Sequence, residues 1–453
     1  MSYSEAIQQL NALVPELYTQ PGKPRRKFSL EEIRVLLEAL GNPQKKFPSV
    51  LIAGTNGKGS TAAALSGILR EAKLRVGLYT SPHLERVNER IRVGEDLIVD
   101  DDFARRYFQV YDAAERLVLA DKLAQMPSFF ETLTAMAFLH FAGLRVEIAV
   151  IEVGMGGRLD ATNIVDPLLS IITDISLDHT EWLGSTITAI AREKAGILRR
   201  GGTLITLPQH PEANQAIGEA ATELGVRGLS ATAYMPPVDA GVKSHYAVEA
   251  LGERMELDQP LAGLHQQRNL ALAIAAAVEL AEQHGFPVTP VAISAGISRG
   301  TVWPGRLELI AETGSAESGR NWLLDVAHNP AGVWSLRAAL NGGWQIPPPR
   351  TLIFSCLRDK PLTELAQILF PLFEEVIFAP INSARATPVD ELIAAAQLTG
   401  TKAIAAASIA DAIERAAADT GDGTIVISGS VYLVGEARPL VLERVHAHVG
   451  GLA

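Results

Sequence analysis

A glycine-rich turn at residues 54–60 is the segment whose residue types and spacing point most directly to chemistry. It reads Gly-Thr-Asn-Gly-Lys-Gly-Ser, follows the apolar run 50–53 and precedes a helix predicted over 61–71. Glycines let a backbone wrap around an anion, a helix N-terminus adds partial positive charge, and a lysine reaches the outer phosphates of a nucleotide. The turn is therefore predicted to bind nucleotide phosphates through Gly54, Thr55, Asn56, Gly57, Lys58, Gly59, Ser60 and Thr61.

The spacing of this turn departs from the common phosphate loop, GxxxxGK[ST], in two places. Ile52 stands where that pattern has its first glycine, and Gly59 separates Lys58 from Ser60. The flanking strand and helix still supply the context that a phosphate loop requires. The hydroxyls of Ser60 and Thr61 could serve phosphate or magnesium. A tight strand-to-helix turn with a solvated lysine is the structural alternative.

A carboxylate, Glu152, follows directly after a second apolar run at 148–151. In open α/β sheets, ligands gather at the carboxyl ends of the strands. Glu152 is therefore predicted to emerge where ligands bind. A solvated carboxylate is its structural alternative.

The rest of the N-terminal part alternates apolar runs of strand length with segments of helical periodicity. Further strands are predicted at 76–80, 148–153, 169–173 and 203–207. Helices are predicted at 29–40, 61–71, 101–119, 131–141 and 187–198. Such alternation is typical of an α/β fold with a mostly parallel sheet covered by helices on both faces.

A second α/β rhythm begins after residue 300. Residues 231–259 lose the alternation and look like short antiparallel strands or an insertion, and a helix is predicted at 269–284. The segment 301–305 contains Pro and Gly and marks a junction. Later strands are predicted near 322–326, 351–355, 375–379 and 424–428. A chain of 453 residues exceeds the size at which one core usually stops growing, which favours two or three domains, and the restarted rhythm predicts two, 1–300 and 301–453.

Composition and charge exclude several classes of protein. The formal net charge of −11 opposes binding to nucleic acid or to an anionic membrane, so neither is expected as a partner. The single cysteine, Cys356, excludes an internal disulfide. The N-terminus lacks the basic and apolar regions of a signal peptide, and no long apolar span follows, so a cytoplasmic location is predicted.

Several short motifs follow the phosphate loop in order along most of the chain. They are Ser-Pro-His-Leu at 81–84, Glu-Val-Gly-Met-Gly-Gly-Arg-Leu-Asp-Ala-Thr-Asn at 152–163, Leu-Asp-His-Thr at 177–180, Glu-Lys-Ala-Gly-Ile at 193–197, Trp-Pro-Gly-Arg-Leu-Glu at 303–308, Asp-Val-Ala-His-Asn-Pro at 325–330 and Gly-Ser-Val-Tyr at 429–432. In this order they resemble the folylpolyglutamate and dihydrofolate synthase family of the Mur ligase superfamily. The resemblance implies a phosphate-loop domain of the central Mur ligase type that binds ATP and the pterin. It also implies a smaller Rossmann-like C-terminal domain for nucleotide closure and glutamate binding.

The resemblance implies two magnesium ions beside the phosphates of ATP. Ser81 and Glu152 match ligands of the ion that bridges those phosphates, and His179 matches a ligand of a second ion. Magnesium prefers oxygen ligands and keeps several waters, so few protein ligands suffice. A capping or core histidine is the alternative for His179.

Lys194 matches the lysine that carries a carbamate in this family. Carbon dioxide adds to a neutral amine and converts a cation into an anion that can hold the second ion. The sequence by itself suggests only a lysine on the exposed face of a helix, so whether Lys194 is carbamylated is left open. The resemblance thus makes Lys58, Glu152, His179 and Lys194 the candidate catalytic residues.

Three more positions match nucleotide contacts of the family. Asn269 is one, Arg306 is directed toward phosphate, and Asp325 toward the sugar or base. The last two follow the junction, so ATP would bridge both domains. Helix packing for Asn269 and surface charge for the other two are the alternatives.

The pterin-binding side of the family is matched less closely. Aromatic side chains can flank a flat heterocycle, but packing in a helix core is an equal alternative for the phenylalanines. The predicted substrate-binding residues are Ser128, Phe129, Phe130, Glu131, Leu159, Asp160 and Ala161. Asp160 could instead form a turn. A departure from the family is Val326, where the usual motif has glycine, and it puts the role of His328 in doubt.

The activity implied by the resemblance is ATP-dependent ligation of L-glutamate to dihydropteroate, to reduced folates or to both, through an acyl phosphate. The expected partners are these small molecules, and the chain is expected to be a monomer. Another Mur-type amino-acid ligase is the alternative within the enzymes, and a non-catalytic nucleotide switch is the alternative outside them. The acceptor, the length of the glutamate chain and the preferred folate form are left open.

Overall fold

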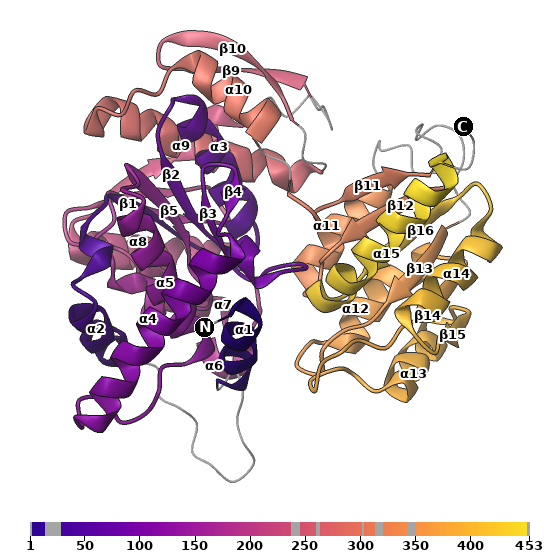
Figure 1. The fold of residues 1–453 in the computed structure, drawn as a ribbon. Coiled ribbons are helices and arrows are strands. Elements are labelled where there is room, and N and C mark those ends of the chain that lie inside the picture. The colour runs from indigo at the N-terminus through magenta and orange to yellow at the C-terminus, as the bar shows by residue number, and fades with distance from the viewer. Residues whose placement is uncertain are drawn as a thin grey trace.

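The structure of the chain is a computed structural model that describes residues 2–13, 29–236, 245–259, 263–300, 303–312, 320–341 and 350–450. Two lobes lie side by side, and each is built around its own sheet (Figure 1). The N-terminal lobe holds an eight-stranded sheet and a separate hairpin, and the C-terminal lobe holds a six-stranded sheet. Within the described ranges, no strand belongs to both sheets.

The sheet of the N-terminal lobe has the order β4-β3-β2-β5-β1-β6-β7-β8. Its strands are β1 Ser49–Ala53, β2 Val76–Tyr79, β3 Ile91–Val93, β4 Asp96–Leu97, β5 Ile148–Glu152, β6 Leu169–Ile172, β7 Thr203–Thr206 and β8 Arg227–Ser230. All neighbours from β2 to β8 pair in parallel, which confirms the mostly parallel sheet. The antiparallel edge strands β3 and β4 were not predicted, because two or three residues are too few to show a period.

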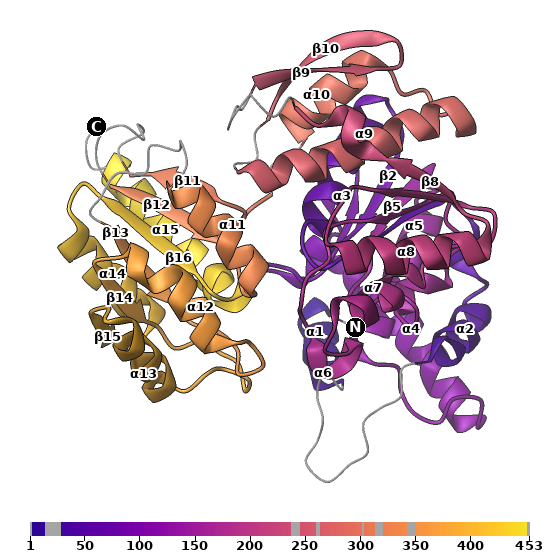
Figure 2. The same cartoon turned by 180° about the vertical axis from the view of Figure 1, so that it is seen from behind.

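Helices cover both faces of this sheet, as expected for an apolar strand buried on two sides. In β1, Leu51 and Ala53 face one core, and Val50 and Ile52 face the other. The first core is covered by α1 Tyr3–Ala12, α2 Leu30–Ala39, α4 Asp100–Leu119, α5 Phe129–Gly143, α6 Thr180–Leu183, α7 Ile187–Ala195 and α8 Pro211–Leu224. The second is covered by α3 Lys58–Glu71, α9 Leu264–His284 and α10 Pro290–Gly300. Figure 2 shows the lobe from the side of α7 and α8.

The hairpin of β9 His245–Ala250 and β10 Glu253–Asp258 packs on the second core. It pairs antiparallel, which confirms the expectation of short antiparallel strands within 231–259. Residues 237–244 of that segment lie outside the described residues. None of the described helices is both long and apolar enough to cross a membrane.

The C-terminal lobe repeats the same layering on a smaller scale. Its sheet has the order β11-β12-β16-β13-β14-β15, with only the β11 pairing antiparallel. The strands are β11 Glu308–Ala311, β12 Asn321–Asp325, β13 Arg350–Phe354, β14 Glu375–Phe378, β15 Ala403–Ala405 and β16 Thr424–Ser428. One face carries α11 Pro330–Asn341, α12 Leu362–Leu369 and α13 Val389–Thr399, and the other carries α14 Ile409–Thr420 and α15 Val431–Gly450.

The four strands predicted after the junction are β12, β13, β14 and β16. The strands β11 and β15 were not predicted. Residues 301–302 of the predicted junction lie outside the described residues. The domain boundary itself, between 300 and 301, stays a prediction.

Candidate functional site

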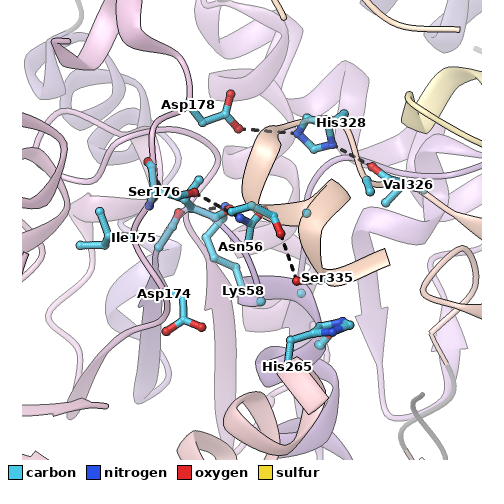
Figure 3. A pocket seen from close by; sticks show the side chains of 18 of the residues that line it. Asn56, Lys58, Asp174, Ile175, Ser176, Asp178, His265, Val326, His328 and Ser335 are labelled. Atoms are coloured by element: carbon cyan, nitrogen blue, oxygen red, sulfur yellow. Dashed lines mark hydrogen bonds and ion pairs between the residues drawn. The ribbon is translucent and has the colours of Figure 1, made fainter. Parts of the chain in front are cut away.

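The carboxyl ends of β1, β5 and β6 face the C-terminal lobe across a cavity of about 270 Å³. In Figure 3, Asn56 and Lys58 lie near the centre of this cavity, while Asp178 and His328 face each other from the two lobes. The cavity is lined by most of the residues predicted to bind nucleotide or metal. These are Gly54, Thr55, Asn56, Gly57, Lys58, Gly59, Ser60, Ser81, Glu152, His179, Lys194, Asn269, Arg306 and Asp325.

The phosphate loop between β1 and α3 is shaped by contacts that only glycine permits. Gly54 has a φ of 153°, and a Cβ there would overlap Oγ1 of Thr173. Thr173 Oγ1 in turn donates a hydrogen bond to the carbonyl of Asn56 at 2.7 Å. Gly57 has a φ of 87° and precedes the first residue of α3, Lys58. The helix therefore begins earlier than the predicted residue 61, and its N-terminus lies in the wall of the cavity.

The ammonium group of Lys58 folds back over this loop. Its Nζ donates to the carbonyl of Gly54 at 3.1 Å and to that of Thr55 at 3.2 Å. Both acceptors are neutral carbonyls, so these two hydrogen bonds do not neutralise the positive charge of Lys58. Thr61 is fully buried outside the cavity lining, so Ser60 is the hydroxyl of the pair that reaches the cavity.

Asn269 of α9 lies against the phosphate loop, and this contact gives a first prediction. A Cβ on Gly57 would overlap Oδ1 of Asn269, whose Nδ2 donates to Gln266 at 2.8 Å. We expect Gly57→Ala to weaken ATP binding about 10- to 100-fold, because displacing a buried hydrogen-bonded amide costs about 1–3 kcal/mol. The dissociation constant of a non-hydrolysable ATP analogue, measured by calorimetry, checks this.

Gly41→Ala is the matched control for that prediction. Gly41 also has a positive φ, 79°, but a Cβ there would have nothing within 4 Å. Both variants bear the same kind of backbone strain, and only one disturbs Asn269. Equal affinities in the two variants would show that Asn269 does not couple to the loop.

Glu152 and Ser81 come together from the adjacent strands β5 and β2. Glu152 is 4% exposed, which excludes the solvated carboxylate considered above, and its Oε2 accepts the backbone N–H of Ser81 at 3.0 Å. Burial raises the pKa of Glu152, while the charge of Lys58, the Ser81 hydrogen bond and Arg306 act in the opposite direction. The carboxylate therefore faces the cationic side of the cavity.

Lys194 is not on an exposed helix face, so the sequence-only interpretation of this residue was wrong. It is 4% exposed, and its Nζ donates to the carbonyl of Gly54 at 2.7 Å. Burial, followed by repulsion from Lys58, lowers the pKa of Lys194 to about 7. Helical periodicity missed this because α7 packs the lysine toward the phosphate loop of another β-α unit.

His179 precedes α6 in a left-handed conformation, with a φ of 49°, and points to the cavity without capping the helix. Burial lowers the pKa of His179 to about 4, against the opposing charge of Asp178. The imidazole is therefore neutral near pH 7, which is the form that binds metal ions.

Asp178 is the centre of a contact between the lobes that the sequence analysis did not assign. From the C-terminal lobe, Lys360 Nζ donates to its Oδ1 at 2.7 Å and Asn329 Nδ2 donates to its Oδ2 at 3.0 Å. Burial by itself would raise the pKa of Asp178, but His328, His179 and Lys360 hold it well below its usual range. Because Asp178 lies within the motif 177–180, the sequence could have indicated it as a site residue. Lys360 lies in none of the motifs, so nothing in the sequence pointed to it.

Arg306 and Asp325 form the C-terminal wall of the cavity. Asp325 is buried and accepts the backbone N–H groups of Leu307 and Ala327, each at 2.9 Å. Burial raises the pKa of Asp325, and Arg306 acts against it. Burial also lowers the pKa of Arg306, with Asp325 and Glu152 opposing. Arg306 thus lies within electrostatic reach of carboxylates from both lobes, and surface charge is excluded for Asp325.

Val326 fits at its position, although the family motif has glycine there. Its side chain is 5% exposed and packs in the core beneath α14 and α15. Its N–H donates to the carbonyl of Gly305 at 2.9 Å. His328 still reaches the cavity, with Nδ1 2.9 Å from the Val326 carbonyl and Nε2 3.7 Å from Asp178 Oδ2.

The residues predicted at the start of α5 divide into structural and accessible ones. Ser128 and Glu131 form a buried capping box, and the ring of Phe130 lies 5.9 Å from that of Tyr79 in the core. Phe129 is only partly buried, and the guanidinium of Arg90 lies 5.3 Å from its ring centre. Of these four residues, Phe129 is the one that is not buried.

The second predicted stretch, Leu159–Ala161, lies next to the main cavity. Leu159 and Asp160 line a smaller cavity of about 100 Å³ together with Trp182, and this cavity shares Met155 with the larger one. Asp160 accepts the N–H groups of Met155 at 2.9 Å and Thr162 at 3.0 Å, the turn-forming role considered as its alternative. Ala161 is buried. Contact of these residues with a substrate stays a prediction.

Comparison with known proteins gives consistent matches over nearly the whole chain. Residues 52–277 match the model of the Mur ligase middle domain, and residues 305–431 match that of the Mur ligase glutamate ligase domain. Folylpolyglutamate synthase of Lacticaseibacillus casei is 35% identical over 98% of this chain and 99% of its own. The dihydrofolate synthase/folylpolyglutamate synthase of Bacillus subtilis is 33% identical over 91% of this chain and 94% of its own.

A solved structure also matches over nearly the whole chain. It is folylpolyglutamate synthase of Mycobacterium tuberculosis in complex with ADP and AMPPCP, with a TM-score of 0.84 and 31% identity over 97% of this chain and 98% of that one.

Proposed function

Because the chain belongs to the folylpolyglutamate and dihydrofolate synthase family of Mur ligases, we propose that it joins L-glutamate to a pterin-bearing carboxylate with Mg-ATP. One observation carries the proposal most directly. A phosphate loop, a buried carboxylate and an arginine of the other lobe line one cavity, at Lys58, Glu152 and Arg306. Dihydropteroate and reduced folates are the proposed acceptors, the chain is proposed to act as a cytoplasmic monomer, and the ranges 1–300 and 301–453 are its proposed domains.

The reaction proceeds in two steps. A carboxylate oxygen of the acceptor attacks the γ-phosphorus of ATP, giving an acyl phosphate and ADP. The amine of glutamate then attacks the acyl carbon, the amide bond forms, and inorganic phosphate and a proton leave. Both steps build negative charge on phosphoryl oxygens, which Lys58 and Arg306 offset from opposite lobes. Contact between the lobes keeps water from the acyl phosphate.

The residues of the cavity fit magnesium. Ser81 and Glu152 would hold the ion at the ATP phosphates, and His179 with a carbamylated Lys194 would hold a second. In the described ranges no three His, Cys, Asp or Glu side chains gather as a metal cage, but magnesium needs few protein ligands. The fit comes from the buried Glu152 carboxylate, which accepts a hydrogen bond from the backbone N–H of Ser81 and retains lone pairs for a hard cation. A bound ion would supply charge neutralisation at the transferred phosphoryl group.

Carbamylation of Lys194 gives a prediction that does not depend on turnover. With a pKa of about 7, the amine is neutral above that pH and protonated below it, and only the neutral amine adds carbon dioxide. In metal-free protein supplied with carbon-13 bicarbonate, we expect a carbamate signal by nuclear magnetic resonance that fades as the pH falls through about 7. Lys194→Arg should lack it.

Lys73→Arg serves as the control, because Lys73 is a solvent-exposed lysine that should not contribute. A carbamate signal that survives in Lys194→Arg, or that is missing above pH 8 in the unaltered protein, contradicts the assignment.

The acceptor is proposed to enter from the side of Phe129 and the smaller cavity at Leu159 and Trp182. A flat pterin could stack against the partly buried ring of Phe129 or of Trp182. Its carboxylate end would then point toward Glu152 and the phosphate loop. Asn269, Arg306 and Asp325 are proposed to hold the nucleotide on the other side.

A single assay tests the proposed function. The protein is given Mg-ATP and labelled glutamate, with dihydropteroate or a reduced folate offered separately, and products are resolved by mass. We expect ADP and a glutamyl amide to appear only when glutamate and an acceptor are both present. ADP formation that ignores both substrates favours a nucleotide switch, and glutamylation of a cell-wall precursor instead favours another Mur-type ligase.

A further inference from the structure

A loop of the N-terminal lobe crosses to the C-terminal lobe beside the candidate site. It comprises residues 80–86, between β2 and the short helix Val87–Arg90, and we call it the strap. Figure 1 shows it as the purple segment that reaches the orange and yellow lobe. The carboxylate of Glu89 accepts the backbone N–H groups of Leu84, Glu85 and Arg86 at 2.8, 2.9 and 2.7 Å. Charge-assisted bonds of this kind make the strap a compact, stiff turn.

The side chain of Leu84 is docked in the core of the other lobe. It packs against the cluster formed by β12, β16, α14 and α15, and among the described residues of that cluster it is the only one from before residue 300. A Cβ placed on Gly305 would lie 3.4 Å from Leu84 Cδ2 and 3.4 Å from Val434 Cγ1. Leu84 is therefore partly buried against the core of the C-terminal lobe.

The backbone of the strap also touches α15 at Gly435. A Cβ on Gly435 would overlap the carbonyl oxygen of Leu84 and lie 2.9 Å from its carbonyl carbon. Gly435 stands inside a helix, where glycine costs about 1 kcal/mol relative to alanine. Close approach of the strap explains why the smallest residue is found there.

An ion-pair bridge completes the docking. Arg438 of α15 donates to Glu308 through Nε and Nη2, with a shortest distance of 2.7 Å, and its Nη1 donates to Glu85 of the strap at 2.7 Å. The hydrogen bonds to Glu308, opposed by burial and supported by Glu85, raise the pKa of Arg438. The Glu308 pair holds the guanidinium in place, so Glu85 meets a fixed partner.

The other end of the strap lies in the candidate metal site. Ser81 donates its N–H to Glu152, and Leu84 follows it only three positions later. An extended chain spans at most about 3.6 Å per residue, so these residues bridge about 11 Å at most. Ser81 at the candidate metal site and Leu84 on the C-terminal lobe therefore belong to one short turn.

We propose that docking of the strap on the C-terminal lobe positions Ser81 beside Glu152, so that the magnesium site is complete only when the two lobes are seated. Leu84, Gly435 and Arg438 are then positioning residues for the phosphoryl transfer, although none of them lines the cavity. This inference rests on the proposed function, because it requires magnesium at Ser81 and Glu152. The enzyme would then use ATP only when the two lobes are in contact.

The test measures how strongly magnesium tightens nucleotide binding. The dissociation constant of a non-hydrolysable ATP analogue is measured by calorimetry without and with Mg²⁺, and the ratio of the two values is the readout. We expect Gly435→Ala and Leu84→Ala to lower this ratio about tenfold or more, the effect of removing a residue that supports a metal ligand. Leu84→Met keeps the apolar contact, so its ratio should be close to that of the unaltered protein.

Matched controls separate positioning from folding. Gly218→Ala is a helix substitution with nothing within 4 Å of the new Cβ, and Glu443→Gln changes an exposed charge on α15. Both variants should show the same ratio of dissociation constants as the unaltered protein. Glu85→Gln removes the strap half of the bridge and leaves Arg438 paired with Glu308, so it provides a milder variant if Gly435→Ala unfolds.

The outcomes are distinct. If folded Leu84→Ala and Glu85→Gln keep the ratio of the unaltered protein, the strap does not position the site and the inference is wrong. If the unaltered protein itself shows no effect of Mg²⁺ on analogue binding, the magnesium site of the proposed function fails, and the role of the strap fails with it. A loss of thermal stability with an unchanged ratio marks a purely structural contact.

Discussion

Lys58→Ala is expected to lower kcat/KM for ATP about 10²- to 10³-fold. Removing one preorganised donor to a developing charge costs about 3–4 kcal/mol in transition-state stabilisation. The Lys58 ammonium donates to the carbonyls of Gly54 and Thr55, which hold its charge over the phosphate loop. Steady-state ADP release with saturating glutamate and acceptor measures the effect.

The fold should survive this substitution, because Lys58 makes no ion pair among the described residues and its backbone stays the first residue of α3. Lys45→Ala, at a residue remote from the cavity, is the control and should keep full activity. Near-normal turnover of Lys58→Ala in the folded state would remove the main support for phosphoryl transfer at this loop.

Glu152→Gln is expected to lower activity at least as much as Lys58→Ala does. It should also raise the Mg²⁺ concentration that gives half-maximal activity. The amide keeps the shape of the side chain but cannot bind a divalent cation strongly or balance Lys58 and Arg306, which both act on Glu152. Losing one preorganised group of this kind costs about 2.7–4 kcal/mol in transition-state stabilisation. We therefore expect kcat to fall about 10²- to 10³-fold and the Mg²⁺ concentration for half-maximal activity to rise.

Magnesium titrations of activity separate Glu152→Gln from Lys58→Ala. In Lys58→Ala the half-maximal Mg²⁺ concentration should stay near its unaltered value, because the ligands of the ion remain. Glu115→Gln, an exposed carboxylate on α4, is the control. If Glu152→Gln responds to Mg²⁺ as the unaltered protein does, Glu152 is not a ligand of the ion.

The phosphate loop and the parallel sheet were predictable because their signals are local. A strand buried on both faces is a continuous apolar run, such as Val50 to Ala53, and a glycine-rich turn after it has few other uses. The restarted rhythm of strands after residue 300 likewise predicted a second sheet. The short edge strands β3 and β4 were missed because pairing, rather than any pattern in two or three residues, makes them strands.

The candidate site was predicted in part by the residues themselves and in part by resemblance. Glu152 could be placed at a strand end from its apolar neighbours alone. His179, Arg306 and Asp325 have no local feature that marks them, and only the resemblance pointed to them. For Phe130, packing in a helix core was an equal alternative, and the structure shows it, whereas the capping box of Ser128 and Glu131 was not predicted.

The sequence by itself thus determined where a phosphate could be wrapped and how the chain divides into strands and helices. The tertiary structure alone decided which charges are buried together. Lys194 looks exposed in its own helix, yet it is buried against Gly54 from 140 positions earlier in the chain. Asp178 and Lys360 meet across the two lobes although 182 positions separate them. Electrostatic energy depends on distance and burial in space, and neither is encoded in the spacing of residues along a chain.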